Sequence, residues 1–213
     1  MGRSDKNTQK IKDTFVKIYP EQQLLGTEDS IQKRIHMINS FHVDKFPSIC
    51  KTHIFKQKDK YIYHQEKIKP LAKQNFLQDD FIPLAEALDY FDSIQFVHGD
   101  LNSKNILWTK NGFKIIDFEP SLLQWKNGCE KLMITPPYAD KQELENKQLS
   151  TLTDKIGFFY FILRKRKILK TKHIVELAKN FNHQDFFNIN DIKEKNFKEI
   201  LKFAAATSPK FAE

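Results

Sequence analysis

Three polar side chains with acid–base and metal-binding chemistry lie close together near the middle of the sequence. Asp100 and Asn105 are five residues apart in "HGDLNSKN", and Asp117 follows twelve residues after Asn105 in "IIDFE". A carboxylate can orient a reacting hydroxyl, and carboxylate and amide oxygens are hard ligands that suit Mg²⁺. Apolar residues flank both segments, so a solvated turn between buried strands is the simpler explanation for any one of these residues alone.

Taken together, the three residues fit the requirements of phosphoryl transfer. That reaction needs a carboxylate to orient the attacking hydroxyl, oxygen ligands for Mg²⁺ and a cation on the nucleotide phosphates. We expect Asp100 to face the hydroxyl and Asn105 to face the metal ion. Asp117, on the next short strand pair, is the second expected magnesium ligand. The constrained spacing of the two segments makes their combination more specific than either segment alone.

The elements that must position these residues begin with a strand-rich segment. β-Branched and aromatic residues alternate with polar ones before Pro20, and again on both sides of the polar turn at 58–60. Between them, Thr27 is a typical helix N-cap that precedes isoleucines at helical spacing. The predicted elements are a strand or tight strand pair over 9–19, a helix over 28–41, and strands over 52–56 and 61–66.

The rest of the chain has mainly helical patterns. Residues 79–94 form a broad apolar face, and residues 153–169 are apolar enough for a buried helix. The paired prolines of "TPPYAD", residues 135–140, exclude a helix there. We expect a short buried strand over 113–118 and a further helix over 196–206.

The segments "HGDLNSKN" and "IIDFE" resemble the catalytic loop and the metal-binding motif of the protein-kinase-like superfamily. The most similar branches have a His-Gly-Asp catalytic loop and include aminoglycoside and choline kinases, lipopolysaccharide core kinases and RIO-like kinases. "TPPYA" at 135–139 resembles the end of an activation segment, and "TDKIGFFYFIL" resembles the buried helix that anchors the catalytic loop. The resemblance covers most of the chain. It implies an α+β, two-lobed fold in one domain, with a minimal strand-rich N-lobe over 1–68 and a mainly helical C-lobe over 69–213.

The resemblance also implies roles for individual residues. Asp100 matches the catalytic base or hydroxyl-orienting group, and Asn105 and Asp117 match the magnesium ligands. Lys17, in "FVKIY", matches the strand lysine that holds the α and β phosphates of ATP. The implied hinge faces the adenine with backbone groups of Glu66, Lys67 and Ile68. The implied supporting residues are His98 and Asp154, which brace the catalytic loop, and Glu28, the best-placed partner for Lys17.

The sequence departs from the family pattern near the expected phosphate site. No Gly-x-Gly-x-x-Gly precedes Lys17, and Glu119 replaces the glycine that follows Asp-Phe. We expect an ATP- and Mg²⁺-dependent kinase whose acceptor is a hydroxyl group on a small molecule, a sugar or a lipid-linked sugar. A serine/threonine protein kinase is one alternative, favoured by "TPPY" and by Asp154. A pseudokinase that serves as a binding module or scaffold is the other, and the missing glycine loop motivates it.

Composition limits the expected partners and compartment. Of the 213 residues, 35 are basic and 27 acidic, and the net charge of +8 favours anionic partners such as nucleotides, phosphorylated metabolites, nucleic acid or an acidic membrane. The basic run 164–172 could bind an anionic acceptor, nucleic acid or membrane headgroups, or it could be a solvated helix end. Cys50 and Cys129 lack metal-ligand spacing, and we find no apolar run of membrane-spanning length and no leader pattern. We therefore expect a cytoplasmic protein.

Overall fold

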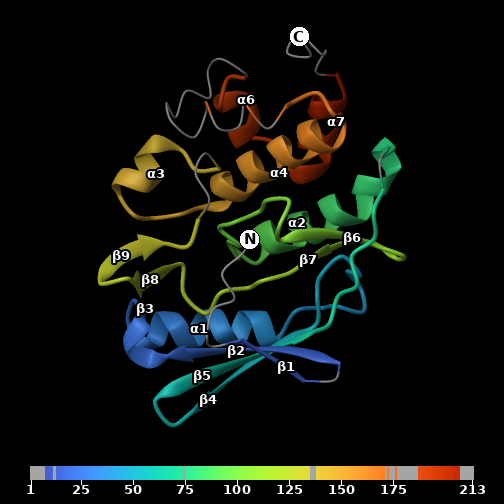
Figure 1. The fold of residues 1–213 in the computed structure, drawn as a ribbon. Helices are drawn as coiled ribbons and strands as arrows, with labels where there is room; N and C mark the ends of the chain where they lie inside the picture. The colour runs from blue at the N-terminus through green and yellow to red at the C-terminus, as the bar shows by residue number, and fades with distance from the viewer. Residues whose placement is uncertain are drawn as a thin grey trace.

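The computed structural model of the protein describes residues 8–11, 13–73, 75–134, 138–170, 172, 176 and 187–206. Within these residues the chain forms an α+β fold with three small antiparallel sheets and six α-helices (Figure 1). This confirms the α+β part of the predicted fold class. Residue 12 of the segment predicted over 9–19, residues 135–137 of "TPPYAD" and residue 171 of the basic run lie outside the described residues.

The first sheet has the strand order β1-β2-β5-β4, and all of its strand pairs are antiparallel. The segment predicted as a strand or strand pair over 9–19 is a hairpin, with Ile11 opposite Thr14. The two later strands are also confirmed, and Lys17 of β2 lies opposite Tyr63 of β5. The strands are β1 (Thr8–Ile11), β2 (Thr14–Pro20), β4 (Thr52–Gln57) and β5 (Lys60–Glu66).

The helix predicted over 28–41 is α1 (Glu28–Asn39), which lies beside the first sheet (Figure 1). The Thr27 hydroxyl accepts a backbone N–H bond from the first turn (3.2 Å), as an N-cap does. The three isoleucines at helical spacing are buried. At the other end, the Asn39 side chain bonds to both the N–H and the carbonyl of Ile54 in β4 (2.8 and 2.7 Å). The Asn39 contacts attach the C-terminal end of α1 to the sheet, and the buried isoleucines lie along the apolar face of the helix.

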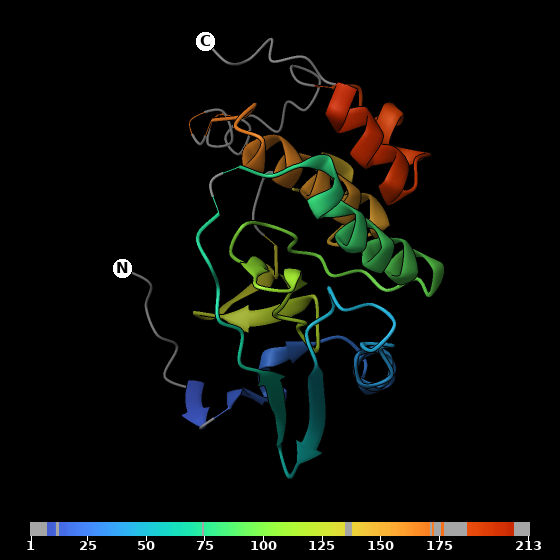
Figure 2. The same cartoon turned by 90° about the vertical axis from the view of Figure 1, so that its right-hand side faces the viewer.

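Helices α2, α4, α6 and α7 gather at the end of the molecule opposite to the first sheet (Figures 1 and 2). The segment predicted over 79–94 starts with a 3₁₀ turn, Gln78–Phe81. The helix predicted over 153–169 ends at Lys165, because Lys167 adopts a left-handed φ of 59°. No helix in the described part of the chain is long and apolar enough to cross a bilayer. The helices are α2 (Ile82–Ser93), α3 (Lys141–Glu145), α4 (Thr151–Lys165), α6 (Asn190–Lys193) and α7 (Phe197–Ala206).

Two smaller sheets lie between the first sheet and these helices (Figure 1). One is the hairpin of β6 (Ile106–Thr109) and β7 (Gly112–Ile115), so the strand predicted over 113–118 ends earlier, at Ile115. The other sheet is absent from the sequence predictions. Its turn, Asn127 and Gly128, has positive φ angles of 54° and 76°, as a tight hairpin turn requires. Its strands are β3 (Leu24–Leu25), β8 (Leu123–Lys126) and β9 (Cys129–Leu132).

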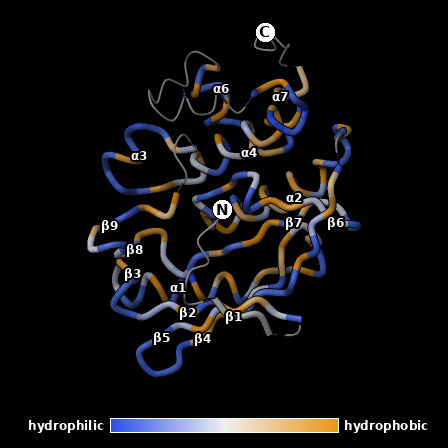
Figure 3. The backbone as a smooth tube through the Cα atoms, in the orientation of Figure 1, coloured by the Kyte–Doolittle hydropathy of each residue, from blue (hydrophilic) through white to orange (hydrophobic). Residues whose placement is uncertain are grey.

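One hydrophobic core runs through the described residues from the first sheet to α7. Phe41, which follows α1, packs against Phe91 of α2 (ring centroids 4.8 Å apart), Phe96 (4.9 Å) and Phe118 (5.1 Å). Figure 3 shows hydrophobic residues along α2 and β7, and hydrophilic residues at the tip of the β4–β5 hairpin. The division predicted near 66–72 falls in the segment between β5 and the 3₁₀ turn.

We predict that Gly157→Ala destabilises the protein, although alanine favours helices over glycine by about 1 kcal/mol. A Cβ atom at Gly157 in α4 would lie 2.7 Å from the Leu101 carbonyl oxygen and 3.1 Å from its Cβ atom. Relief of this overlap must move backbone, so we expect a net loss of about 1–3 kcal/mol in the free energy of unfolding. Urea unfolding measures it. Gly157→Ser should cost more, and a neutral or stabilising Gly157→Ala would contradict the close approach.

Candidate functional site

A buried carboxylate of α4 holds the start of residues 98–105, which we call the HGD loop. Asp154 accepts the backbone N–H of His98 (2.6 Å) on one oxygen and that of Gly99 (2.8 Å) on the other. Asp154 is 2% exposed, and this burial raises its pKa to about 7, although the two N–H bonds act in the opposite direction. Gly99 has a φ of 89°, in the region that favours glycine. The backbone of the HGD loop is thus fixed at the first turn of α4.

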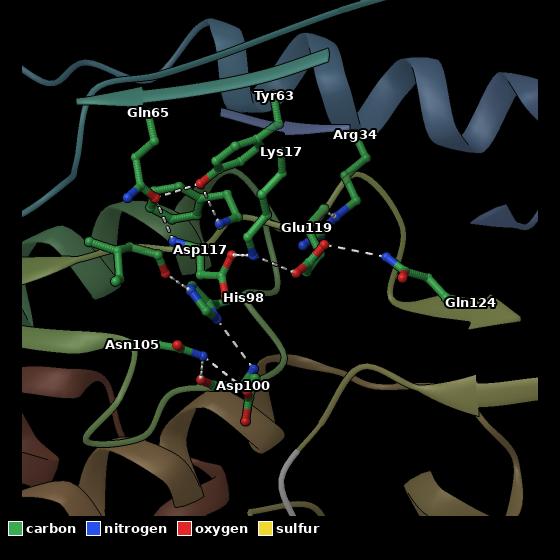
Figure 4. Close-up of polar contacts among 12 residues, drawn as sticks. Lys17, Arg34, Tyr63, Gln65, His98, Asp100, Asn105, Asp117, Glu119 and Gln124 are labelled. Carbon is green, nitrogen blue, oxygen red and sulfur yellow. Dashed lines mark hydrogen bonds and ion pairs between the residues drawn. The ribbon is translucent and has the colours of Figure 1, made fainter. Parts of the chain in front are cut away.

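His98 links the HGD loop to the segment that follows β7 (Figure 4). Its Nδ1 atom accepts the N–H of Asp100 (3.2 Å), so Nε2 carries the proton and donates to the carbonyl of Ile116 (2.9 Å). The side chain is buried, and burial lowers its pKa to about 4. His98 is therefore a neutral structural bridge with both ring nitrogens occupied.

Two amide side chains of the HGD loop orient Asp100. Asn102 Nδ2 donates to Asp100 Oδ1 (2.7 Å), and Asn105 Nδ2 donates to Oδ2 (2.9 Å) and to the Asp100 carbonyl (2.9 Å). The structure thus brings two of the predicted site residues, Asp100 and Asn105, into direct contact. With Nδ2 engaged, Asn105 Oδ1 accepts no hydrogen bond from the residues that the structure describes. Asn102 was not predicted, because an asparagine in a polar turn carries no distinctive sequence signal.

Asp117 lies next to the HGD loop because of the register of the β6–β7 hairpin. The N–H of Ile116 donates to the carbonyl of Asn105 (2.9 Å), so the residue after Ile116 leaves the hairpin beside the loop. Asp117 has a left-handed φ of 70°, an unfavourable conformation for a residue with a side chain. Gln65 at the end of β5 accepts its N–H (2.9 Å), and Gln65 is itself held by the Tyr63 hydroxyl (2.6 Å). The first sheet therefore helps to hold Asp117 in this conformation.

Lys17 of β2 meets two carboxylates of the segment "IIDFE" (Figure 4). Its Nζ atom forms an ion pair with Asp117 and a longer one with Glu119 (3.4 Å). Burial lowers the pKa of Lys17, but the negative charges of Glu119 and Asp117 raise it by more, so the pKa lies above its ordinary value. Burial also raises the pKa of Glu119, whose side chain is 13% exposed, while Lys17 opposes this rise. The predicted Lys17 and Asp117 are thus in contact, with Glu119 as an unpredicted third member.

The prediction that Glu28 pairs with Lys17 is wrong. Glu28 is in the first turn of α1 and pairs with Lys56 of β4 (2.9 Å), which also binds Glu21 (2.7 Å). Within the described residues, the ion-pair partners of Lys17 are Asp117 and Glu119. The glutamate at 119, where the motif that this segment resembles has glycine, is the sequence signal that could have identified this partner.

Helix α1 instead contributes a cation to the site. Arg34 Nε donates to the carbonyl of Glu119 (2.7 Å), and Nη1 donates to the carbonyl of Val97 (2.7 Å). The guanidinium carbon lies 4.5 Å from the centre of the Phe96 ring. Burial lowers the pKa of Arg34 to about 10. Arg34 therefore ties α1 to the backbone on both sides of the site, a role that no sequence motif indicated.

A cavity of about 270 Å³ opens beside Lys17. Of the three predicted hinge residues, Lys67 and Ile68 line it, and Glu66 does not. Glu66 is engaged elsewhere, since its carboxylate accepts from Lys114 (3.0 Å) and its N–H donates to the carbonyl of Lys51 (2.9 Å). The N–H of Lys67 donates to the backbone carbonyl of Asp13 (3.2 Å). Of the three hinge residues, Ile68 is thus the one whose N–H donates to no backbone carbonyl of the described residues. The lining residues are Thr14, Phe15, Lys17, Gln65, Lys67, Ile68, Ile116 and Asp117.

The site offers two oxygen ligands for a metal ion. The residues that the structure describes include no group of three or more histidine, cysteine or acidic side chains that could hold an ion by themselves. Asn105 Oδ1 and the second carboxylate oxygen of Asp117 take no hydrogen bond from the described residues. Mg²⁺ is usually bound by one or two carboxylates together with substrate phosphates and water. The residues present therefore fit an Mg²⁺ ion that is shared with a phosphorylated ligand.

We predict that Lys17→Met lowers the free energy of unfolding by about 2–3 kcal/mol, because it leaves two partly buried carboxylates side by side without a cation. Addition of Glu119→Gln should restore about half of the loss, since one of these charges is then removed. Urea unfolding of both single variants and the double variant at pH 7 gives the coupling. Lys56→Met, which breaks exposed ion pairs, is the matched control and should change stability little. Strictly additive effects would contradict the three-residue cluster.

We predict that His98 makes stability fall as the pH falls. The pKa of its imidazole drops from 6.5 to about 4 on folding, so between these values the unfolded chain binds a proton that the folded chain does not. The free energy of unfolding is therefore highest above pH 6.5, where His98 is neutral in both states. It falls by up to about 3 kcal/mol as the pH is lowered towards 4.

Urea unfolding of the wild type and His98→Gln from pH 4.5 to 7.5 measures this effect. The stability difference between the two proteins should shrink by about 2–3 kcal/mol as the pH falls from 7 to 4.5. Asp154, whose raised pKa gives the opposite slope, contributes to both proteins and cancels in this difference. Exposed His53→Gln is the control. A difference that is independent of pH would rule out a neutral, buried His98.

Comparison with protein-family models and with curated proteins finds no match to this sequence. Contacts and charges within the chain are therefore what supports a function.

Proposed function

We propose that the protein is a kinase-like phosphotransferase that moves the γ-phosphoryl group of Mg·ATP to a hydroxyl acceptor. One observation carries the proposal: Lys17 from β2 pairs with Asp117 after β7 at the wall of a cavity, and the residue before Asp117 is bonded to Asn105, which holds Asp100 in the HGD loop. These are the cation, the metal ligands and the hydroxyl-orienting carboxylate that phosphoryl transfer needs. In this proposal residues 1–68 form a small strand-rich lobe and residues 69–213 a helical lobe, with ATP between them.

The cavity beside Lys17 is the proposed nucleotide site. Its volume of about 270 Å³ is near the lower end for ligand pockets, and part of a bound nucleotide would extend beyond it. Phe15 and Ile68 supply apolar surface for the adenine, and the free N–H of Ile68 can donate to a ring nitrogen. Lys17 and Lys67 supply positive charge for the phosphates.

The HGD loop orients the acceptor in this proposal. The acceptor oxygen attacks the γ-phosphorus, the bond from that phosphorus to the bridging oxygen of ADP breaks, and the hydroxyl proton passes to Asp100. Asn102 and Asn105 hold both oxygens of the Asp100 carboxylate, which fixes its direction before the acceptor arrives. When bound, Mg²⁺ would neutralise charge on the phosphates, and Asn105 and Asp117 would hold it. His98 is neutral with both nitrogens engaged, so it positions the loop and transfers no proton.

A pseudokinase is the second candidate function, and the β1–β2 hairpin favours it. Ile11 pairs with Thr14, so two residues join these strands, and no glycine-rich loop can extend from this turn over the phosphates. Without such a loop, the phosphates of a bound nucleotide would be more exposed to solvent than in a kinase that has one. The protein-kinase alternative depends on "TPPY", of which residues 135–137 lie outside the described residues.

Calorimetric titration of ATP with and without Mg²⁺, combined with a phosphate-transfer assay, tests the proposal. We expect Mg²⁺-dependent binding to the wild type that is lost in Asp117→Ala, because a metal ligand is removed. Asp100→Ala should bind Mg·ATP within about twofold of the wild type and lose at least about 10²-fold in transfer. Asp59→Ala, at the exposed tip of the β4–β5 hairpin, is the control.

Two results would contradict the proposal. Absence of ATP binding to the wild type would favour the pseudokinase. Transfer by Asp100→Ala at the wild-type rate would remove Asp100 from the reaction.

A further inference from the structure

A second cavity, of about 400 Å³, borders the HGD loop on the side of α4. Four of its lining side chains are basic, and none is acidic. Ser103 of the HGD loop forms one wall, and the C-terminal end of α4 and the segment before the 3₁₀ turn at 78–81 form the others. We call it the basic cavity. Its lining residues are Lys73, Phe76, Ser103, Arg164, Lys165 and Lys167.

Three of these cations have no carboxylate partner among the described residues. Arg164 donates to the Ser103 hydroxyl (3.2 Å), and Lys167 donates to the side-chain oxygen of Asn75 (3.4 Å). Lys165 contacts the aromatic rings of Phe76 and Phe161, each centroid 5.4 Å away. The fourth cation, Lys73, does pair with a carboxylate, that of Asp80 (2.6 Å). The basic cavity therefore has an uncompensated positive charge.

Basic residues at the C-terminal end of a helix are common, because they interact favourably with the helix dipole. Three observations go beyond that explanation. The side chains line a cavity together with Phe76 and Ser103, and Lys165 is half-buried there, although Arg164 and Lys167 are themselves exposed. Arg164 is bonded to the HGD loop itself, three residues after Asp100. Burial and the neighbouring charge of Arg164 lower the pKa of Lys165, so the free protein disfavours the charge that an anion would stabilise.

The spacing between the basic cavity and Asp100 limits the size of a ligand that reaches both. Asp100 and Ser103 are three residues apart, and three extended residues span at most about 11 Å. A small molecule with an anionic group at one end and a hydroxyl at the other can bridge this distance. A ligand of this size needs no extended groove.

We infer that the basic cavity binds the phosphate group of a small phosphorylated acceptor, such as a sugar phosphate, and thereby directs its free hydroxyl towards Asp100. Arginine can bind two phosphate oxygens at once, and lysines add point charges around them. Phe76 supplies an apolar surface for the body of the ligand. This inference rests on the proposed function for the reaction, whereas the anion site itself does not depend on nucleotide binding.

Titration of inorganic phosphate into the nucleotide-free protein, followed by calorimetry at low salt, tests the inference. We expect the double variant Arg164→Gln/Lys165→Gln to bind phosphate at least tenfold more weakly than the wild type. Lys58→Gln/Lys60→Gln removes the same charge from the exposed β4–β5 turn and should bind as the wild type does. Asp117→Ala should also bind phosphate normally, so loss of ATP binding and loss of the anion site are separate results.

Three outcomes would overturn the inference. The first is no phosphate binding to the wild type, and the second is equal binding to the wild type and the Arg164→Gln/Lys165→Gln variant. The third is binding of a short RNA or of phosphatidylserine vesicles that depends on Arg164 and Lys165 while inorganic phosphate does not bind, which would assign the basic residues to a macromolecular surface.

Discussion

The buried carboxylate of Asp154 is the contact on which the candidate site depends. It lies in the first turn of α4, where the helix dipole favours negative charge, and accepts two backbone N–H groups of the HGD loop. His98 extends this hold to the carbonyl of Ile116, so one carboxylate positions both polar segments of the site. The close approach of Gly157 to Leu101 brings the same helix against the same loop. The position of Asp100 is thus set by α4 and not by the loop alone.

Lys17 is the cation that compensates two carboxylates, Asp117 and Glu119, in a partly buried setting. Arg34 lies nearby but donates to the backbone carbonyl of Glu119. Removing Lys17 leaves both carboxylates uncompensated, which is costly at low dielectric. In the proposed function, a nucleotide with its metal ion would bring both signs of charge into this group. Its binding would therefore exchange existing pairs, with Lys17 moving from Asp117 towards phosphate.

Local sequence patterns predicted most of the elements and the central site residues. Alternation and helical spacing identified the strands of the first sheet and helices α1, α2 and α7. Helix α4 was identified by its apolar character, which fits the burial of all its residues from Thr153 to Leu163. The paired spacing of "HGDLNSKN" and "IIDFE" identified Asp100, Asn105 and Asp117. The prediction failed where long-range packing decides: Glu28 was assigned by its place in a helix, but the side of α1 that reaches the site carries Arg34.

The β8–β9 hairpin and the basic cavity are both absent from the sequence predictions, for different reasons. Asn127 and Gly128 are a strong hairpin signal, and their strands β8 and β9 were absent from the prediction. The basic cavity could not be predicted, because residues 73, 103 and 164 meet only after α4 packs beside the HGD loop. The sequence shows that the run 164–172 is basic, but it does not show that Arg164, Lys165 and Lys167 line a cavity.

The two attachments of Glu119 have a consequence for regulation. Its carboxylate pairs with Lys17 and its carbonyl accepts from Arg34, so both the side chain and the backbone of this position are held. Moving the segment elsewhere would break both contacts, at a cost of about 3 kcal/mol. An alternative arrangement with that penalty is populated by less than about 1% of molecules. The free protein therefore holds this segment in one arrangement, and a ligand or partner that moved it would have to supply at least that free energy.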